Sequence, residues 1–186
     1  MLGDLWSFQG RYRTLHLTWI AFFLTFVVWF NLAPLATTVK ADLGLTVGQI
    51  RTVASCNVSL TIPARVLIGM LLDKFGPRIT YSSILVFSAI PCLLFASAQD
   101  FNQLVVARLL LSIVGAGFVI GIRMVAEWFP PKEIGLAEGI YGGWGNFGSA
   151  FSALSMVALA GLLSFSGGFE LPTGAVLNWR GAIALT

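Results

Sequence analysis

Charged side chains are scarce in this sequence: Asp, Glu, Lys and Arg together make up 10% of its 186 residues. Soluble globular domains carry about 25% charged residues, so this scarcity excludes an ordinary soluble enzyme or binding domain. Hydrophobic residues make up 57% of the chain, and the mean hydropathy is +0.87. The composition therefore predicts an integral membrane protein.

Side chains that bind metals or form disulfides are also few. Cys56 and Cys92 both lie in apolar stretches, which favours small buried side chains over a disulfide or a metal pair. The one histidine, His16, is not at metal-ligand spacing from either of them. We therefore expect no metal site and no cofactor. The formal net charge of +3 comes from bases that are scattered singly, so we expect no nucleic-acid partner.

Long apolar runs make up most of what is present, and a run of about 20 residues has the length of a helix that crosses a bilayer. These runs predict an all-α bundle with spans at residues 16–38, 48–72, 79–98, 103–127 and 134–165, and a sixth span that begins near residue 179. Only about eight residues remain for that last helix, too few to cross about 30 Å of hydrocarbon. We therefore expect residues 1–186 to be an N-terminal bundle truncated in its sixth helix, with a C-terminal half absent.

The basic residues near the ends of the spans indicate the orientation of the chain, because Lys and Arg are enriched in cytoplasmic loops. One side carries more of them than the other: Arg11, Arg13, Lys74, Arg78 and Lys132 against Lys40 and Arg180. We expect the first of these sides, and with it the N-terminus, to be cytoplasmic.

Residues 139–148, GIYGGWGNFG, form an unusually glycine-dense run. Gly143, Gly145 and Gly148 spell G-x-G-x-x-G, and Glu170 lies at about the distance of a ribose-binding acid, which would indicate a dinucleotide-binding oxidoreductase. That motif has meaning only after a strand, and the segment that precedes the run, KEIGLAE, does not predict one. We therefore set the nucleotide interpretation aside.

On a helix the same run has a small face and a bulky face. Gly139, Gly142, Gly143 and Asn146 share the small face, at the i, i+3, i+4, i+7 spacing, so we expect this face to pack closely against another helix. The glycines could serve packing alone or substrate contact as well. Asn146 needs partners at this depth, and its two donors and one acceptor suit a small polar solute.

Polar residues interrupt the second apolar run. Pro63 lacks an amide hydrogen and clashes with the carbonyl of Ser59, which predicts a kink. Arg65 lies about 12 Å deeper than Asp73 if both are on one helix, near the middle of the bilayer. No acid lies at a comparable depth in the sequence, which favours an anionic solute over a structural ion pair as the partner of Arg65.

The stretch from Gly69 to Arg78 matches G-x-L-x-D-[RK]-x-G-x-R, and so resembles the cytoplasmic signature between the second and third helices of the major facilitator superfamily. Gly76 would allow a tight turn and Pro77 would open the next helix. We expect Asp73 to form a charge cluster with Lys74 and Arg78 that locks one conformation.

The fourth span also resembles its counterpart in that superfamily, because Arg108 is followed by small residues at positions 115, 117 and 121. Arg108 lies about 9 Å from the external end, close enough to reach water by snorkelling, so a structural and a proton-coupling role both remain open. Arg123 and Glu127 are placed to form an i, i+4 ion pair.

The stretch from Ala137 to Gly148 resembles the fifth-helix signature of the nitrate/nitrite porter family, and IPARVLIG carries an arginine like the one in that family's second helix. The resemblance implies twelve helices in two halves, with nitrate held between an arginine of the second helix and one of the eighth. Arg65 and Asn146 match the family's arginine and asparagine, and Gly142, Gly143 and Gly145 would line the same substrate site.

We therefore expect the N-terminal half of a nitrate/nitrite transporter and not an enzyme. It would use alternating access in the cell (inner) membrane for nitrate assimilation, with nitrate or nitrite, the lipid bilayer and the missing half as partners. Two alternatives remain open: a porter of the same superfamily for another small anion such as an organic carboxylate, and a non-transporting interaction or sensor subunit.

Overall fold

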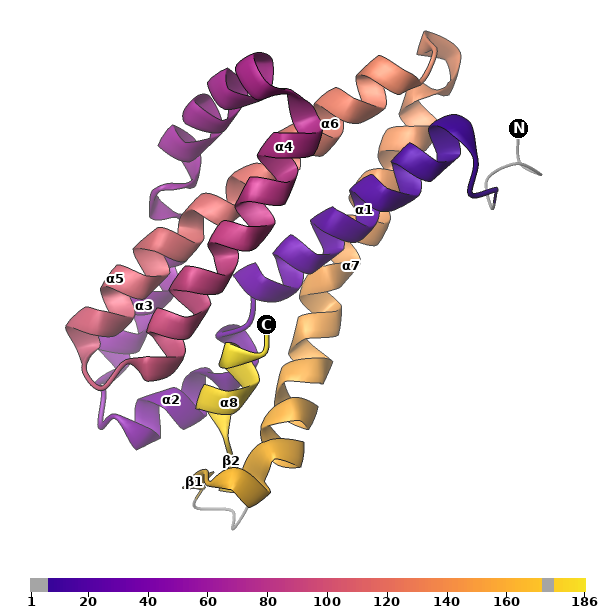
Figure 1. The fold of residues 1–186 in the computed structure, drawn as a ribbon. Helices are drawn as coiled ribbons and strands as arrows, with labels where there is room; N and C mark the ends of the chain where they lie inside the picture. Colours follow the sequence, from indigo (N-terminus) through magenta and orange to yellow (C-terminus); the bar gives the residue numbers. More distant parts are fainter. Residues whose placement is uncertain (1–6, 172–175) are drawn as a thin grey trace.

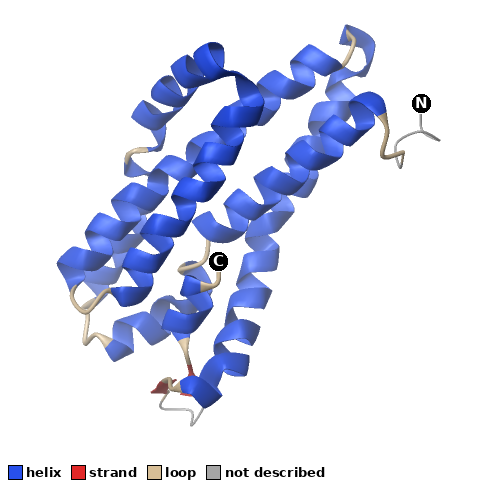
Figure 2. Cartoon of the chain, viewed as in Figure 1, coloured by secondary structure: helices blue, strands red, loops and turns tan. Residues whose placement is uncertain are grey.

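The computed structural model describes residues 7–171 and 176–186, which are almost entirely helical (Figures 1 and 2). The α-helices are α1 Gly10–Trp29, α2 Ala36–Asp42, α3 Val47–Ser59, α4 Thr61–Ser97, α5 Phe101–Ser112, α6 Gly117–Trp128, α7 Pro131–Leu162 and α8 Trp179–Ala184. Short 3-10 helices, η2 Ala33–Leu35, η3 Ile113–Ala116 and η4 Leu163–Ser166, extend three of them. Within the described residues, the one departure from an all-α fold is a small antiparallel ladder of β1 Phe169–Glu170 and β2 Val176–Leu177.

Four helical stretches of the described chain are long and apolar enough to cross a membrane: residues 10–42, 47–97, 101–128 and 131–166. The second contains two of the spans that the sequence predicts, since α4 folds back on itself (Figure 1). Its backbone leaves the helical region only at Gly76, where φ is +76°. Glycine adopts this conformation without steric cost, so the predicted glycine turn is confirmed, and Pro77 opens the second leg of α4.

The predicted interruption near Pro63 is confirmed as well. Helix α3 ends at Ser59 and α4 begins at Thr61, which places Pro63 in the first turn of the new helix, where a missing amide hydrogen does least harm. Ser112 of α5 satisfies the polar groups at the break. Its hydroxyl accepts from the amide of Leu60 at 3.2 Å, and its carbonyl accepts from the hydroxyl of Thr61 at 3.0 Å.

Helices α1 and α7 pack side by side along much of their length (Figure 1). Two glycines of α7 permit the close approach. A Cβ at Gly145 would overlap the ring of Phe22, and one at Gly148 would meet the carbonyl oxygen of Phe23. The Ser152 hydroxyl continues this seam by donating to a carbonyl oxygen of α1 at 3.1 Å.

Within the described chain, the expected packing face of the glycine-rich run does not pack against another helix. An added Cβ at Gly139, Gly142 or Gly143 would meet nothing within 4 Å, and Asn146 is exposed. The buried face of α7 is offset from this one around the helix, and it includes the bulky Tyr141. Small residues occur on both faces, so spacing alone did not separate them.

Large apolar side chains on the outer faces of α4 and α7 are strongly exposed, including Ile62, Val66, Leu154 and Leu162. Contiguous exposed apolar surface on this scale is typical of proteins that contact lipid or further protein. The fold therefore presents its predicted membrane-spanning surface outward and keeps its polar side chains at a few defined places.

Candidate functional site

Helix α4 places Arg65 on an exposed face, between the exposed side chains of Ile62 and Val66, while Ala64 and Ile68 point into the bundle. The guanidinium forms no hydrogen bond or ion pair with any residue that the structure describes. The structural ion pair considered from the sequence is thus not formed within the described chain. The charge of Arg65 is therefore available to a group outside the described chain.

Asn146 is also exposed, on α7. Its side-chain amide donates to the carbonyl oxygen of Gly142 at 2.7 Å, one turn earlier in the same helix. This bond uses one of its two donor hydrogens and leaves the side-chain oxygen free to accept. Gly143 lies on the open surface as well, where it helps to line a groove of about 580 Å³ along α7.

The structure separates the residues that the sequence assigns to the substrate. No hydrogen bond links Arg65 to Asn146 in the described chain, and α7 packs mainly on α1 while α4 packs on α6 and α5. The described chain does not form a closed site around these residues, which are all accessible at its surface: Arg65, Gly142, Gly143 and Asn146. Gly145 differs from them because its close neighbour is Phe22, so a substrate role for Gly145 would act through packing.

The charge cluster at the predicted cytoplasmic end is formed by other residues than the sequence analysis expects. The Asp73 carboxylate pairs with Arg123 of α6 at 3.3 Å, and Arg123 also pairs with Glu127 at 2.5 Å, as the i, i+4 spacing predicts. The expected pairing of Asp73 with Lys74 and Arg78 is wrong, because the turn that follows aims Asp73 at α6. The Lys74 ammonium lies instead over the ring of its neighbour Phe75, 5.3 Å from the centroid.

These ion pairs can open easily. The side chains of Arg123 and Asp73 are 52% and 69% exposed, and exposed pairs contribute only about 0–1 kcal/mol. Gly69 lies on the same leg of α4, with open space where a Cβ would be. The Asp73–Arg123 pair therefore joins α4 to α6 with a contact that is weak enough to break and re-form during a conformational cycle.

Arg108 does not snorkel, although its predicted distance from the external end would allow it. Its side chain is buried to 1% exposure and points into the bundle along the inner face of α5. The guanidinium donates to the side-chain oxygens of Asn57 at 3.2 Å and of Asn31 at 3.0 Å. It also lies 4.6 Å from the ring centroid of Phe95. The side-chain amides of Asn31 and Asn57 and the ring of Phe95 therefore contact the guanidinium in place of water.

Sequence reasoning did not single out Asn31 as a member of this cluster. Asn31 is fully buried in the turn after α1, and it also donates to the hydroxyl of Thr186 at 3.0 Å. Trp29 and Asn57 bond reciprocally, each donating to the other's carbonyl oxygen, at 2.8 and 2.9 Å. The available signal was that Asn31, Asn57 and Arg108 each interrupt an otherwise apolar run.

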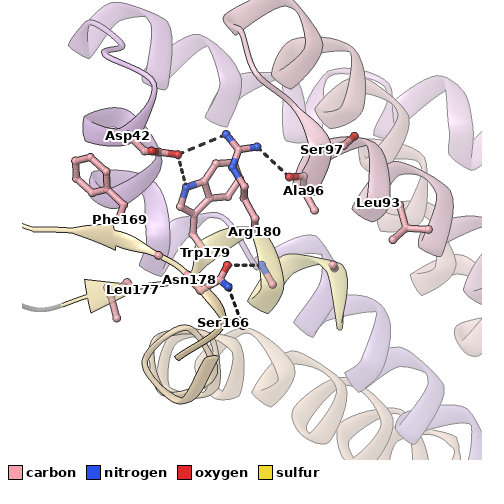
Figure 3. Close-up of a pocket in the computed structure, with 14 residues that line it drawn as sticks. Asp42, Leu93, Ala96, Ser97, Ser166, Phe169, Leu177, Asn178, Trp179 and Arg180 are labelled. Carbon is pink, nitrogen blue, oxygen red and sulfur yellow. Dashed lines mark hydrogen bonds and ion pairs between the residues drawn. The ribbon is translucent and has the colours of Figure 1, made fainter. Parts of the chain in front are cut away.

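A pocket of about 680 Å³ lies where α8 meets the ends of α2 and α4, and Figure 3 shows its side chains. Its charged groups satisfy one another. Asp42 accepts from the Trp179 indole at 2.8 Å and pairs with Arg180 at 3.5 Å, while Arg180 donates to the carbonyl oxygen of Ala96 at 3.0 Å (Figure 3). This cluster ties α8 to the bundle and leaves no charge for a ligand.

Comparison with known proteins supports the resemblance. Residues 18–185 match the family model of the Major Facilitator Superfamily. The chain is 62% identical to the nitrate/nitrite transporter NrtP of Picosynechococcus sp. and 61% identical to that of Nostoc punctiforme, with 100% of this chain and 38% and 36% of those proteins covered. It is 30% identical to the probable nitrate/nitrite antiporter NarK1 of Thermus thermophilus, over 91% of this chain and 38% of that protein.

The chain thus spans 36–38% of the length of these relatives. The match to the family model extends over nearly all the helices of the bundle. This chain belongs to the major facilitator superfamily.

Proposed function

We propose that this chain forms the N-terminal part of a secondary transporter that moves nitrate, nitrite or both across the cell (inner) membrane by alternating access, for nitrate assimilation. The observation that carries the proposal is Arg65, an exposed cation with no partner in the described chain, within the otherwise apolar residues 62–72 of α4. A charge at that place in a membrane faces a cavity or pairs with a partner. The relatives that match the whole chain are named nitrate/nitrite transporters.

The guanidinium of Arg65 suits this substrate. Nitrate and nitrite are planar, and a planar guanidinium can meet two of their oxygens with parallel N–H bonds. Asn146, next to the open backbone of Gly142 and Gly143, offers further hydrogen bonds from α7. In this proposal a C-terminal half covers the exposed faces of α4 and α7 and brings a second arginine to the anion.

The exposed ion pair between Asp73 and Arg123 has a part in the cycle. It closes the end of the bundle that carries the N-terminus, which we assign to the cytoplasm from the distribution of basic residues. Because the pair is weak, substrate-driven rearrangement can break it, as a rocking transporter requires.

The test is Arg65→Lys, assayed by uptake of labelled nitrate into liposomes that contain the full-length transporter. Lysine keeps the charge but loses the planar fork, so we expect uptake to fall to near background. The matched control is Arg13→Lys, at an exposed arginine near the N-terminus of α1. Wild-type uptake by Arg65→Lys would overturn the substrate role, and stronger inhibition by acetate than by nitrite would favour the carboxylate porter.

A further inference from the structure

A second pocket lies near the end of the bundle where α2 meets α3, on the opposite side of the Leu60 break from Arg65. It has a volume of about 360 Å³, and η2, α2, α3 and α5 contribute to it. Two of its lining residues are charged, and both are arginines, Arg51 and Arg108. No acidic side chain is among the described residues that line it.

Arg108 brings a charge that the described bundle does not balance. Its hydrogen-bond partners, Asn31 and Asn57, are neutral, and its Nε atom is buried with no hydrogen-bond partner. None of the ion pairs formed in residues 7–171 and 176–186 includes Arg108. An ion held away from water costs several kcal/mol, which amide dipoles and the ring of Phe95 offset only in part.

Arg51 extends the positive field to the mouth of the pocket. It lies on the same side of α3 as Ala54 and Asn57, at a spacing of three residues, and about 9 Å of helix separates it from Asn57. Arg51 is exposed and takes part in no ion pair within the described residues. An anion that enters the pocket would meet Arg51 first and Arg108 at the base.

The walls between the two arginines limit the kind of anion. Trp29, Phe30 and Leu32 line one side, so little of the lining can replace the water shell of a strongly hydrated divalent ion. A single negative charge would match the one buried cation. A planar oxyanion can in addition accept from the unpartnered Nε–H of Arg108.

We propose that this pocket is a second anion site, separate from Arg65, which binds one small monovalent oxyanion of the nitrate or nitrite type as the counter-ion of Arg108. Only the identity of the anion rests on the proposed function. The presence of the site rests on the buried unbalanced arginine and on the pocket that it helps to line.

Asn57→Asp is a sharp test because it adds an internal counter-ion. The Asn57 side-chain oxygen is already 3.2 Å from Arg108, so a carboxylate there would form an ion pair and displace a bound anion. The substitution gives up the hydrogen bond to the carbonyl oxygen of Trp29 and gains the ion pair, so we expect the fold to persist. Arg51→Gln changes an exposed residue and provides an independent second variant.

The measurement is the rise in unfolding temperature of the full chain with nitrate concentration, because a ligand of the native state stabilises it. The background carries Arg65→Gln, and sulfate at equal ionic strength corrects for general salt effects. We expect a saturable nitrate effect in this background, its loss with Asn57→Asp, and a midpoint shifted about fivefold upward with Arg51→Gln.

Two results would overturn the second site: no saturable nitrate effect with Arg65→Gln alone, or an unchanged midpoint in both pocket variants. Neither result bears on the Arg65 transport role, which is judged by uptake. If Arg65→Lys keeps wild-type uptake while the nitrate effect still depends on Asn57 and Arg51, then the transport proposal fails and the second site stands.

Discussion

Two polar regions of the bundle differ in how their side chains are used. Arg108 is buried, and it bonds Asn31 and Asn57 across three helical segments. Arg65 and Asn146 stand on exposed faces of α4 and α7, and neither bonds to another helix of the described chain. Each is a single polar residue in an apolar run, so residue type does not separate the two regions. Exposure in the fold separates a group that bonds to other segments of the bundle from groups that do not bond to another helix of the described chain.

The two regions should differ most in free energy of unfolding when the arginine of each region is replaced, in separate variants, by a neutral residue. Arg108→Met leaves the side-chain oxygens of Asn31 and Asn57 without their donor, and an acceptor left unsatisfied inside the bundle costs about 1–3 kcal/mol. Arg65→Met changes an exposed side chain and should shift the free energy of unfolding by about 0.5 kcal/mol or less. Unfolding in detergent, followed by tryptophan fluorescence, measures both. Equal stability of the two variants would contradict the comparison.

A substitution in the exposed region should change the affinity for nitrate and leave the stability of the fold unchanged. Asn146→Leu keeps the size of the side chain and loses its hydrogen bonds, and one bond to a charged partner contributes about 1.5–3 kcal/mol. We expect nitrate affinity to fall roughly ten- to a hundredfold, with an unchanged unfolding temperature. Ser149→Ala, one turn further along α7, serves as the control and should bind as the parent does. Unaltered uptake kinetics for Asn146→Leu would assign Asn146 to the helix alone.

The glycines of α7 give the same contrast within one helix. Gly145→Val forces a branched side chain into the ring of Phe22 and should destabilise the fold by about 1–3 kcal/mol. Gly143→Val points into open space and should leave the free energy of unfolding nearly unchanged. Comparison of the two variants by thermal unfolding and membrane yield tests the α1–α7 contact directly. A larger loss for Gly143→Val would mean that α7 packs through its other face.

The smallest effect is expected at the exposed ion pair between α4 and α6. Asp73→Asn removes the charge that faces Arg123 and should cost about 1 kcal/mol or less, since both side chains are solvated. The loss should be seen at low salt and should vanish near 1 M salt, where the Debye length is about 3 Å. Lys74→Gln, the neighbouring residue without an ion pair in the described chain, should change neither value.

Features with a local cause could be predicted from the sequence. The turn at Gly76, the helix break before Pro63 and the Arg123–Glu127 pair each depend on residues within one or two helical turns. The length and apolarity of the runs likewise indicated the membrane-spanning helices. The family signatures added the identity of the bundle and singled out Arg65 and Asn146.

Features that depend on how a helix is rotated about its axis could not be predicted. Small residues of α7 lie on two faces, and only the ring of Phe22 on α1 selects the one with Gly145. The direction of the Arg108 side chain could not be read from its position in the run, because one residue of helix rotates a side chain by about 100°. The partner of Asp73 lies 50 positions away in sequence, beyond any local pattern.

The turn at Gly76 has a consequence for insertions and deletions in related sequences. The two legs of α4 meet at a single non-helical residue, so the connection has no slack. One residue added beside Gly76 must unwind part of a leg or rotate it by about 100°, which would move Tyr81 and Ile84 from the interior to the surface. Surface loops usually tolerate such changes in length. Here a connection at the surface sets the rotation of a whole helix about its axis. In related sequences the length of this connection should therefore stay fixed even where its residues change.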